Sequence, residues 1–168
     1  MNKTTNIRVV QTYLLLLTIV VLCASIYLQY FVHLHPCPLC LMQRSCVVLI
    51  GIFSLFTCYM ATRNKRITIL IVAQFISAVA GIVFALRQIW LQSLPYDHDA
   101  MCLPGLDILM NYFSWADVAY TFLWGSAECG AVTWRLLGFS MAAWSALYFV
   151  IVAIVSGYAW YIVARIER

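Results

Sequence analysis

The sequence predicts an all-α membrane protein, a bundle of four transmembrane helices with a long loop on one side. Of the 168 residues, 65% are hydrophobic and only 10% are charged, and the mean hydropathy is +0.93. Soluble domains carry about 25% charged residues, so this chain has too few charges to cover a surface in water. We therefore expect one integral membrane domain, residues 1–168, surrounded largely by lipid.

Four stretches are apolar and long enough to cross a bilayer core, which takes about 20 residues of helix. Backbone polar groups in lipid must be satisfied within the segment, so each stretch is expected to be a helix. The first stretch is too long for a removable signal peptide and lacks a small-residue cleavage pattern, so we expect it to be retained. The predicted spans are 9–31, 41–61, 67–91 and 141–163.

Basic residues gather on one side of this four-span arrangement. Three lie on the side of the long loop: Arg44, Arg87 and Arg135. The other seven lie at the N-terminus, in the second connection or at the C-terminus: Lys3, Arg8, Arg63, Lys65, Arg66, Arg165 and Arg168. The positive-inside rule then places both termini in the cytoplasm. The net charge of +4 is explained by topology and does not indicate a nucleic-acid partner.

Two loops are predicted on the outward side, a short one at about 32–40 and a long one at about 92–140. Within the long loop, residues 106–124 mix aliphatic and aromatic side chains with a few acids and no basic residue. This composition fits a short amphipathic helix at the membrane interface, where Trp and Tyr rings are favoured. Alternatively, these aromatic residues only pack the loop onto the bundle.

The predicted topology divides the seven cysteines into two groups. Three fall within the spans, where a free cysteine usually behaves as a small hydrophobic residue: Cys23, Cys46 and Cys58. The other four face outward, where disulfides persist if the compartment is the periplasm: Cys37, Cys40, Cys102 and Cys129. The outward group is therefore the candidate for chemistry.

Cys37-Pro38-Leu39-Cys40 is a C-x-x-C motif at the start of the second span. Pro38 suits the first position of a helix, where its missing N–H costs nothing. This places Cys37 at the N-cap and Cys40 in the first turn. Unpaired N–H groups and the positive end of the helix dipole stabilise a thiolate there, which favours redox chemistry.

Other uses of the motif are less well supported. A c-type haem attachment needs a histidine after the second cysteine, and position 41 is Leu. A zinc site could draw ligands from His33 and His35, but Cys102 and Cys129 lack the tight spacing of a second ligand pair. A structural disulfide would restrain little of the unfolded chain, because only two residues separate the cysteines.

Arg44 shares a helical face with Cys37 and Cys40, because the three positions are spaced three and four apart. An arginine inside a span costs up to about 3 kcal/mol at mid-depth. One reason to keep it is that a cation beneath Cys40 would stabilise its thiolate and the negative charge on a reduced acceptor. Alternatively, Arg44 extends to the interface from a position near the helix end.

Cys102 and Cys129 both lie in the long outward loop. A disulfide between them would be either a static loop staple or an exposed bond of the kind that exchanges readily. The C-x-x-C motif on the same membrane face favours exchange.

Several motifs follow one another along nearly the whole chain: Pro36-Cys37-Pro38-Leu39-Cys40-Leu41-Met42-Gln43-Arg44, Trp90-Leu91-Gln92 with Leu94-Pro95, Cys102, Glu128-Cys129, Trp134 with Leu136-Leu137-Gly138, and Trp144. With these motifs in this order, the chain resembles the bacterial disulfide-bond-formation protein B (DsbB) family. Two places depart from the family. Arg87-Gln88 stands where some members carry a histidine nearby, and Ala142 stands where a proline is common.

The resemblance implies a four-helix membrane oxidase in the bacterial inner membrane, with its redox cysteines on the periplasmic side. Such proteins reoxidise the periplasmic dithiol oxidase DsbA and reduce ubiquinone or menaquinone, with no metal. Carried over by motif, Cys102 would be attacked by the partner's thiolate and Cys129 would pass the electrons to Cys37. Cys40 would face the quinone, with Arg44 beside the quinone ring.

An external electron acceptor is also required on chemical grounds, because disulfide exchange conserves the number of disulfides. The sequence shows no flavin or haem motif, and a lipid-soluble quinone can reach a thiolate at the membrane surface. One alternative is an oxidase of the vitamin K epoxide reductase type, but there the loop pair precedes the C-x-x-C motif. Another is a membrane metal-binding protein that uses His33, His35, Cys37 and Cys40.

Overall fold

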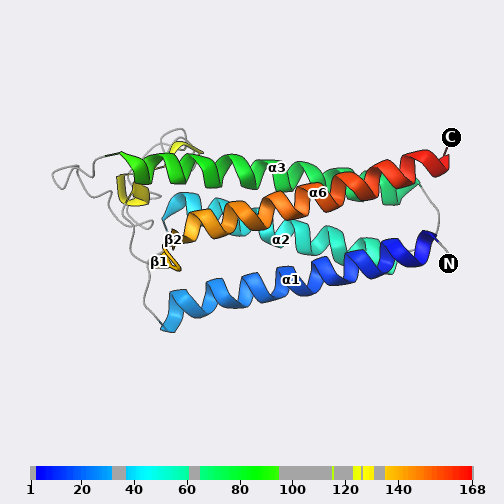
Figure 1. The fold of residues 1–168 in the computed structure, drawn as a ribbon, viewed down its shortest axis with the longest axis horizontal. Helices are drawn as coiled ribbons and strands as arrows, with labels where there is room; N and C mark the ends of the chain where they lie inside the picture. Colours follow the sequence, from blue (N-terminus) through cyan, green and yellow to red (C-terminus); the bar gives the residue numbers. More distant parts are fainter. Residues whose placement is uncertain are drawn as a thin grey trace.

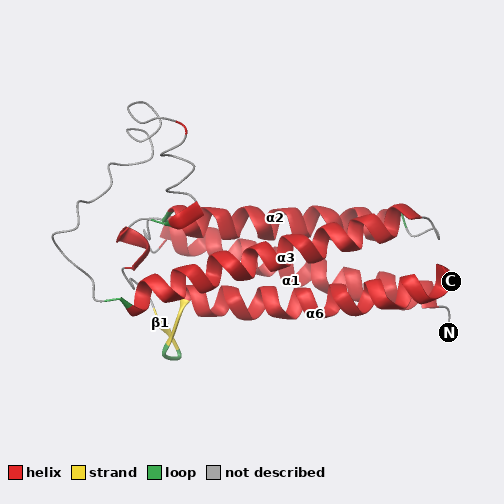
Figure 2. Ribbon diagram, turned by 90° about the horizontal axis from the view of Figure 1, so that it is seen from above, coloured by secondary structure: helices red, strands yellow, loops and turns green. Residues whose placement is uncertain are grey.

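The computed structural model describes residues 3–31, 37–60, 65–94, 115, 123–125, 127–130 and 135–167. Four long helices run side by side along the molecule (Figure 1): α1 Lys3–Phe31, α2 Pro38–Tyr59, α3 Lys65–Ser93 and α6 Met141–Glu167. The chain termini lie at one end of the bundle. The starts of α2 and α6 and the end of α3 lie at the other (Figure 2).

The predicted four-helix membrane fold is confirmed. Each long helix contains a stretch long and apolar enough to cross a membrane, namely Ile7–Phe31, Pro38–Tyr59, Arg66–Ser93 and Met141–Arg165. The second helix begins three residues before the start expected from apolarity, because Pro38 is well suited to a first turn. The amphipathic helix expected within 106–124 lies mostly outside the described residues. Within this range the structure describes Trp115 and residues 123–124, and these are helical.

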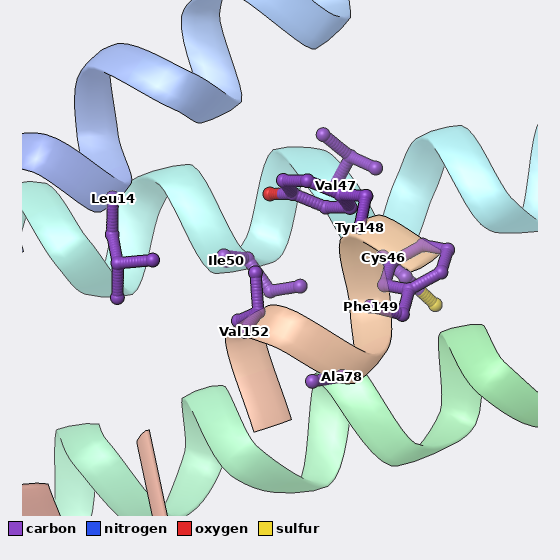
Figure 3. Packing of buried hydrophobic residues seen from close by; sticks show 8 residues of the cluster. All are labelled: Leu14, Cys46, Val47, Ile50, Ala78, Tyr148, Phe149 and Val152. Carbon is purple, nitrogen blue, oxygen red and sulfur yellow. The ribbon is translucent and has the colours of Figure 1, made fainter. Parts of the chain in front are cut away.

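The bundle is held by helix faces that meet in its interior. α3 packs against both α2 and α6, while α1 packs against α2. All four helices contribute to one hydrophobic cluster (Figure 3), formed by Leu14, Cys46, Val47, Ile50, Ala78, Tyr148, Phe149 and Val152. Close approach of α3 and α6 depends on Gly81, because a Cβ there would collide with the Phe149 ring. Small residues at such contacts are typical of helices that associate in lipid.

Large apolar side chains also cover the outside of the helices. Tyr13 is 69% exposed, Ile69 67% and Ile154 66%, and the same holds for many others on all four helices. A soluble monomer rarely exposes a contiguous apolar surface of this kind. The outer faces of the bundle are therefore suited to lipid.

The three cysteines predicted within the spans differ in their surroundings. Cys46 is buried in the hydrophobic cluster, as expected of a small hydrophobic residue. Cys58 is partly buried, with its Sγ 3.7 Å from the Thr12 hydroxyl. Cys23 lies within the first span, as predicted, and is exposed on the outer side of α1. Its sulfur faces outward because the buried face of α1 carries Gln11, Leu14 and Thr18 instead.

A short hairpin precedes α6. Strands β1 (Arg135–Leu136) and β2 (Phe139–Ser140) pair antiparallel around Leu137 and Gly138. Both turn residues have positive φ, 54° and 84°, as a type I′ hairpin turn requires. The Trp144 indole N–H donates to the Leu136 carbonyl at 3.3 Å, which ties the hairpin to the first turn of α6.

Candidate functional site

The C-x-x-C motif begins α2 in the way the sequence predicts. Cys37 has extended backbone angles, φ −71° and ψ 163°, and occupies the N-cap, with Pro38 as the first helical residue. The Leu41 N–H donates to the Cys37 carbonyl at 3.2 Å and closes the first turn. Cys40 therefore lies within that turn, close to backbone N–H groups that favour negative charge.

The two cysteine side chains of the motif are in direct contact. Cys37 Sγ donates to Cys40 Sγ at 3.0 Å, which is a hydrogen-bond distance and longer than the roughly 2.05 Å of a disulfide. Cys37 is buried, whereas Cys40 is partly exposed. Of the two residues, Cys40 is thus the more exposed to the surroundings of the bundle.

Cys129 joins this pair from the segment between α3 and α6. It lies in the 3-10 helix η1 (Ala127–Gly130), is 1% exposed, and packs in a cluster with Cys37 and Leu39. Its side chain hydrogen bonds to Cys37. This bond, followed by the hydrogen bond to Cys40 and by burial, raises the pKa of Cys37 above that of an ordinary thiol. The structure therefore gathers three of the four predicted redox cysteines.

The segment that carries Cys129 is held against the ends of α2 and α3. Gly125 has φ +83°, and a Cβ there would lie 2.7 Å from Leu39 Cδ1 and 2.9 Å from Leu91 Cδ1. Only glycine allows both that backbone angle and that approach. In addition, Arg87 Nε donates to the Trp124 carbonyl at 3.2 Å.

Gln88 is a site residue that the sequence did not identify. Its Nε2 lies 3.2 Å from Cys40 Sγ and 3.6 Å from Cys37 Sγ, and its Oε1 accepts from Gln43 Nε2 at 2.7 Å. Both glutamines are buried inside membrane-length helices. A polar side chain within a span is a signal of function, but Gln11 and Gln74 carry the same signal elsewhere.

Arg44 is held by α1. Its Nε and Nη2 donate to the Ser25 hydroxyl at 3.1 and 2.7 Å, Nη2 also donates to the Ser25 carbonyl at 3.3 Å, and Nη1 donates to Gln29 Oε1. Four of the five guanidinium N–H groups therefore have acceptors on α1. Within the described part of the chain, the direct donor to Cys40 from another helix is Gln88 rather than Arg44.

Some predicted site residues fall outside the described part of the chain, namely Cys102, His33 and His35. Among the described residues, no group of three or more His, Cys, Asp or Glu side chains has an arrangement that could hold a metal ion, and this includes the three contacting cysteines.

The chemistry available to this site is thiol–disulfide exchange. Cys129 and Cys40 both hydrogen bond to Cys37, so a disulfide can pass from one neighbour of Cys37 to the other with small side-chain movements. Amide and backbone N–H groups around Cys40 favour a thiolate, which is the form that attacks disulfides and electron acceptors.

Comparison with known proteins identifies similar chains. The family model described as Disulfide bond formation protein DsbB matches residues 7–159. Disulfide bond formation protein B of Stutzerimonas stutzeri (strain A1501) is 40% identical over 133 residues, which cover 78% of this chain and 80% of that protein. The protein of the same name from Hahella chejuensis (strain KCTC 2396) is 36% identical over 136 residues, 81% of this chain and 82% of the other.

A longer match is found to disulfide bond formation protein B of Acinetobacter baylyi (strain ATCC 33305 / BD413 / ADP1). It is 35% identical over 151 residues, 88% of this chain and 87% of that protein. No solved structure matches the chain significantly.

Proposed function

The chain belongs to the disulfide bond formation protein B (DsbB) family, and we propose that it couples thiol oxidation to quinone reduction. It is a multi-pass membrane oxidoreductase that generates disulfides and reoxidises a DsbA-like partner. In the proposed reaction, one partner dithiol and one ubiquinone or menaquinone give one partner disulfide and one quinol. Two electrons and two protons move in each turnover, and the enzyme's own disulfides are restored.

The meeting of Cys37, Cys40 and Cys129 is the observation that carries this proposal. Cys129 comes from the segment before α6 and the other two from the start of α2, yet all three sulfurs form one contact group. A static staple would need only one pair of cysteines. A third sulfur in contact is what a relay between two disulfides requires.

The proposed electron route begins at Cys102, which accepts attack by the partner's thiolate and forms a mixed disulfide. Cys129 then passes the electrons to Cys37, with which it is in contact. Cys40 is the exit, because it is the partly exposed member of the pair. Each transfer breaks one S–S bond and forms another, so the number of disulfides changes only when quinone accepts the electrons.

Arg44 is the proposed contact for the quinone. A quinone oxygen accepts hydrogen bonds, and the fifth guanidinium N–H, on Nη1, has no acceptor among the described residues. Ser25 and Gln29 hold the rest of the guanidinium in place, one helical turn beyond Cys40. When bound, the quinone would accept the two electrons that leave the protein, so that the enzyme's own disulfide is restored.

The proposed orientation places the chain as a single domain in the bacterial inner membrane, with both termini cytoplasmic and the cysteines periplasmic. The basic residues described near the ends of the helices support it. The start of α1, the start of α3 and the end of α6 lie at the end of the bundle with the termini (Figure 1). By their positions in these helices, five described basic residues belong to that end, namely Lys3, Arg8, Lys65, Arg66 and Arg165, against Arg44, Arg87 and Arg135 at the other end. Positive charge of this kind is retained on the cytoplasmic side.

The function is tested with purified protein, a reduced DsbA-like partner and a soluble quinone analogue. We expect one quinone to be reduced for each pair of partner thiols lost, followed by quinone absorbance and thiol counting. Cys40→Ser should lower the rate by about a thousandfold or more, because the exit sulfur is gone. Cys46→Ala, in the hydrophobic cluster, is the matched control and should keep the normal rate. Normal quinone reduction by Cys40→Ser would disprove the route.

The order of the relay has its own test. In Cys129→Ser, the mixed disulfide at Cys102 cannot be resolved, so a covalent partner adduct should accumulate there. Peptide mass spectrometry locates the adduct. An adduct at Cys37 would reverse the proposed order.

A further inference from the structure

Two buried glutamines connect the helices to the cysteine pair. Gln43 lies on α2, one turn after Cys40, and Gln88 lies on α3. Gln43 Nε2 donates to Gln88 Oε1 at 2.7 Å, and Gln88 Nε2 lies 3.2 Å from Cys40 Sγ and 3.6 Å from Cys37 Sγ. A chain of hydrogen bonds therefore runs from α2 to α3 and back to the sulfurs of α2.

The direction of these bonds determines which end of Gln88 meets the sulfurs. A glutamine amide has an oxygen that only accepts and a nitrogen that only donates. Because Gln43 donates to Gln88 Oε1, the NH2 end of Gln88 faces Cys40. If the Gln88 amide were turned over, its NH2 group would face that of Gln43 and its oxygen would face the sulfur. Gln43 thus holds Gln88 as a donor to sulfur.

We propose that Gln88 is a catalytic residue that donates its amide N–H to a Cys40 thiolate in the reduced enzyme, and that Gln43 is its positioning residue. The proposal rests on the proposed function, in which Cys37 and Cys40 form a redox pair. Reduction by two electrons breaks the Sγ–Sγ bond, takes up one proton, and leaves a thiol on Cys37 and a thiolate on Cys40. The Cys37 thiol is one donor to Cys40, at 3.0 Å, and Gln88 is the second.

The two oxidation states differ in how strongly they accept these bonds. A hydrogen bond to an ionised acceptor is roughly twice as strong as one between neutral groups. The sulfurs of a disulfide are neutral and accept weakly, so Gln88 stabilises the reduced pair more than the oxidised pair. A low dielectric around buried groups increases this difference. Gln88 thereby makes Cys37–Cys40 a stronger oxidant, which favours the arrival of electrons from the loop cysteines.

The test measures the redox equilibrium of Cys37 and Cys40 in the purified full-length protein. The protein is equilibrated with mixtures of reduced and oxidised dithiothreitol, and both states are counted by alkylation and peptide mass spectrometry. Gln88→Met keeps the side-chain length and removes the amide. We expect its equilibrium constant for reduction to fall about tenfold, which is about 30 mV for a two-electron couple.

Variants of Gln43 separate positioning from direct contact. Gln43→Met should lower the same constant by about threefold, because the Gln88 amide is then free to turn over. The double variant should do no more than Gln88→Met alone, since Gln43 acts only through Gln88. Gln74→Met is the matched control. It removes another buried glutamine of α3, one that donates to Ser54, and should leave the redox equilibrium unchanged.

An unchanged equilibrium in folded Gln88→Met, or full additivity in the double variant, would overturn the proposal. If Gln88→Met does not fold, Gln43→Met decides, and no change in its equilibrium would overturn the proposal equally. Failure of the proposed function is recognised separately. If the proposed function is wrong, the wild-type protein will not reduce quinone when a reduced partner is added. The redox equilibrium of Cys37 and Cys40 is measured without quinone and without the partner, so it tests Gln88 independently.

Discussion

Buried glutamines occur in two regions of the bundle, and the two regions use them differently. At the cysteine end, Gln43 and Gln88 hydrogen bond to each other, and Gln88 reaches the sulfurs. In the half nearer the termini, Gln11 and Gln74 are 0% exposed. Gln74 Nε2 donates to Ser54 at 3.1 Å, but Gln74 Oε1 and both amide atoms of Gln11 have no partner among the described residues.

The difference shows what gives a buried amide a chemical role. Both Gln43–Gln88 and Gln74–Ser54 link α2 to α3, and such bonds contribute about 0.6 kcal/mol on average to helix association in membranes. At the cysteine end, however, the remaining N–H of the amide is directed at a sulfur that can carry charge. In the other half, the one described partner of these amides is the Ser54 hydroxyl, so we expect them to affect stability rather than redox chemistry.

The largest expected effect comes from disturbing the cysteine end without touching a cysteine. Gly125→Ala would place a methyl group 2.7 Å from Leu39 and 2.9 Å from Leu91 and strain a φ of +83°. The segment that carries Cys129 should shift, and partner-driven quinone reduction should fall about a hundredfold, as a displacement near 1 Å can cause. Gly138→Ala is the control, because its φ is +84° but no atom lies within 4 Å. Equal loss in both variants would contradict the role of the Gly125 contact.

A smaller effect is expected at Arg44, the proposed quinone contact. Arg44→Ala should raise the KM for quinone about tenfold with little change in kcat, because a charge-assisted hydrogen bond is lost in binding. Arg44→Lys should recover little, since an ammonium group cannot reproduce the forked contacts to Ser25 and Gln29. Arg135→Ala, exposed on the hairpin at the same end, is the control. An unchanged KM in Arg44→Ala would remove Arg44 from the quinone site.

The two cysteines of the motif should differ in reactivity in the reduced protein. We expect iodoacetamide to modify Cys40 about tenfold faster than Cys37, because the thiolate is the reactive form. The raised pKa of Cys37 means that it stays protonated as the pH passes the ordinary thiol value of about 8.5, so its alkylation should not accelerate there. Mass spectrometry after timed quenching measures both rates. Faster labelling of Cys37 would reverse their assigned roles.

The smallest effect on activity is expected in the half nearer the termini. Gln11→Leu removes two buried amide atoms that lack partners in the described structure, so stability should rise by about 1–2 kcal/mol. Unfolding in detergent measures the change, and quinone reduction should stay at the wild-type rate. Gln74→Leu should gain less, because it leaves the Ser54 hydroxyl without its donor. A loss of activity in Gln11→Leu would contradict the proposal that the glutamines nearer the termini affect stability but not the reaction.

The helices and the position of the C-x-x-C motif at the start of α2 could be predicted from the sequence, because both are determined by local interactions. In lipid each span must satisfy its own backbone, so apolar length alone predicts the helices. Pro38 between two cysteines predicts the N-cap, and α2 begins there. The outward position of Cys23 could not be predicted, because apolarity does not show which side of a span faces lipid.

Gln43 and Gln88 could not be singled out by such reasoning. The predicted spans contain Gln11, Gln29, Gln43, Gln74 and Gln88. Gln43 belongs to the family motif and Gln88 stands where some members carry a histidine nearby, but nothing in the sequence shows that Gln43 bonds to Gln88 or that Gln88 reaches the cysteines. Arg44 stood out because its charge is costly in a span, yet its hydrogen bonds reach α1 and not the cysteines.

The sequence by itself determined the number of helices, the cysteines available for exchange and, through the family resemblance, the reaction to expect. Only the tertiary structure decided that Cys129 lies against Cys37 and that Gln88 donates to Cys40. The physical reason is the range of the interactions. Hydrophobicity and helix capping act within a few residues, whereas 45 positions separate the two glutamines, which meet only because α2 and α3 pack together.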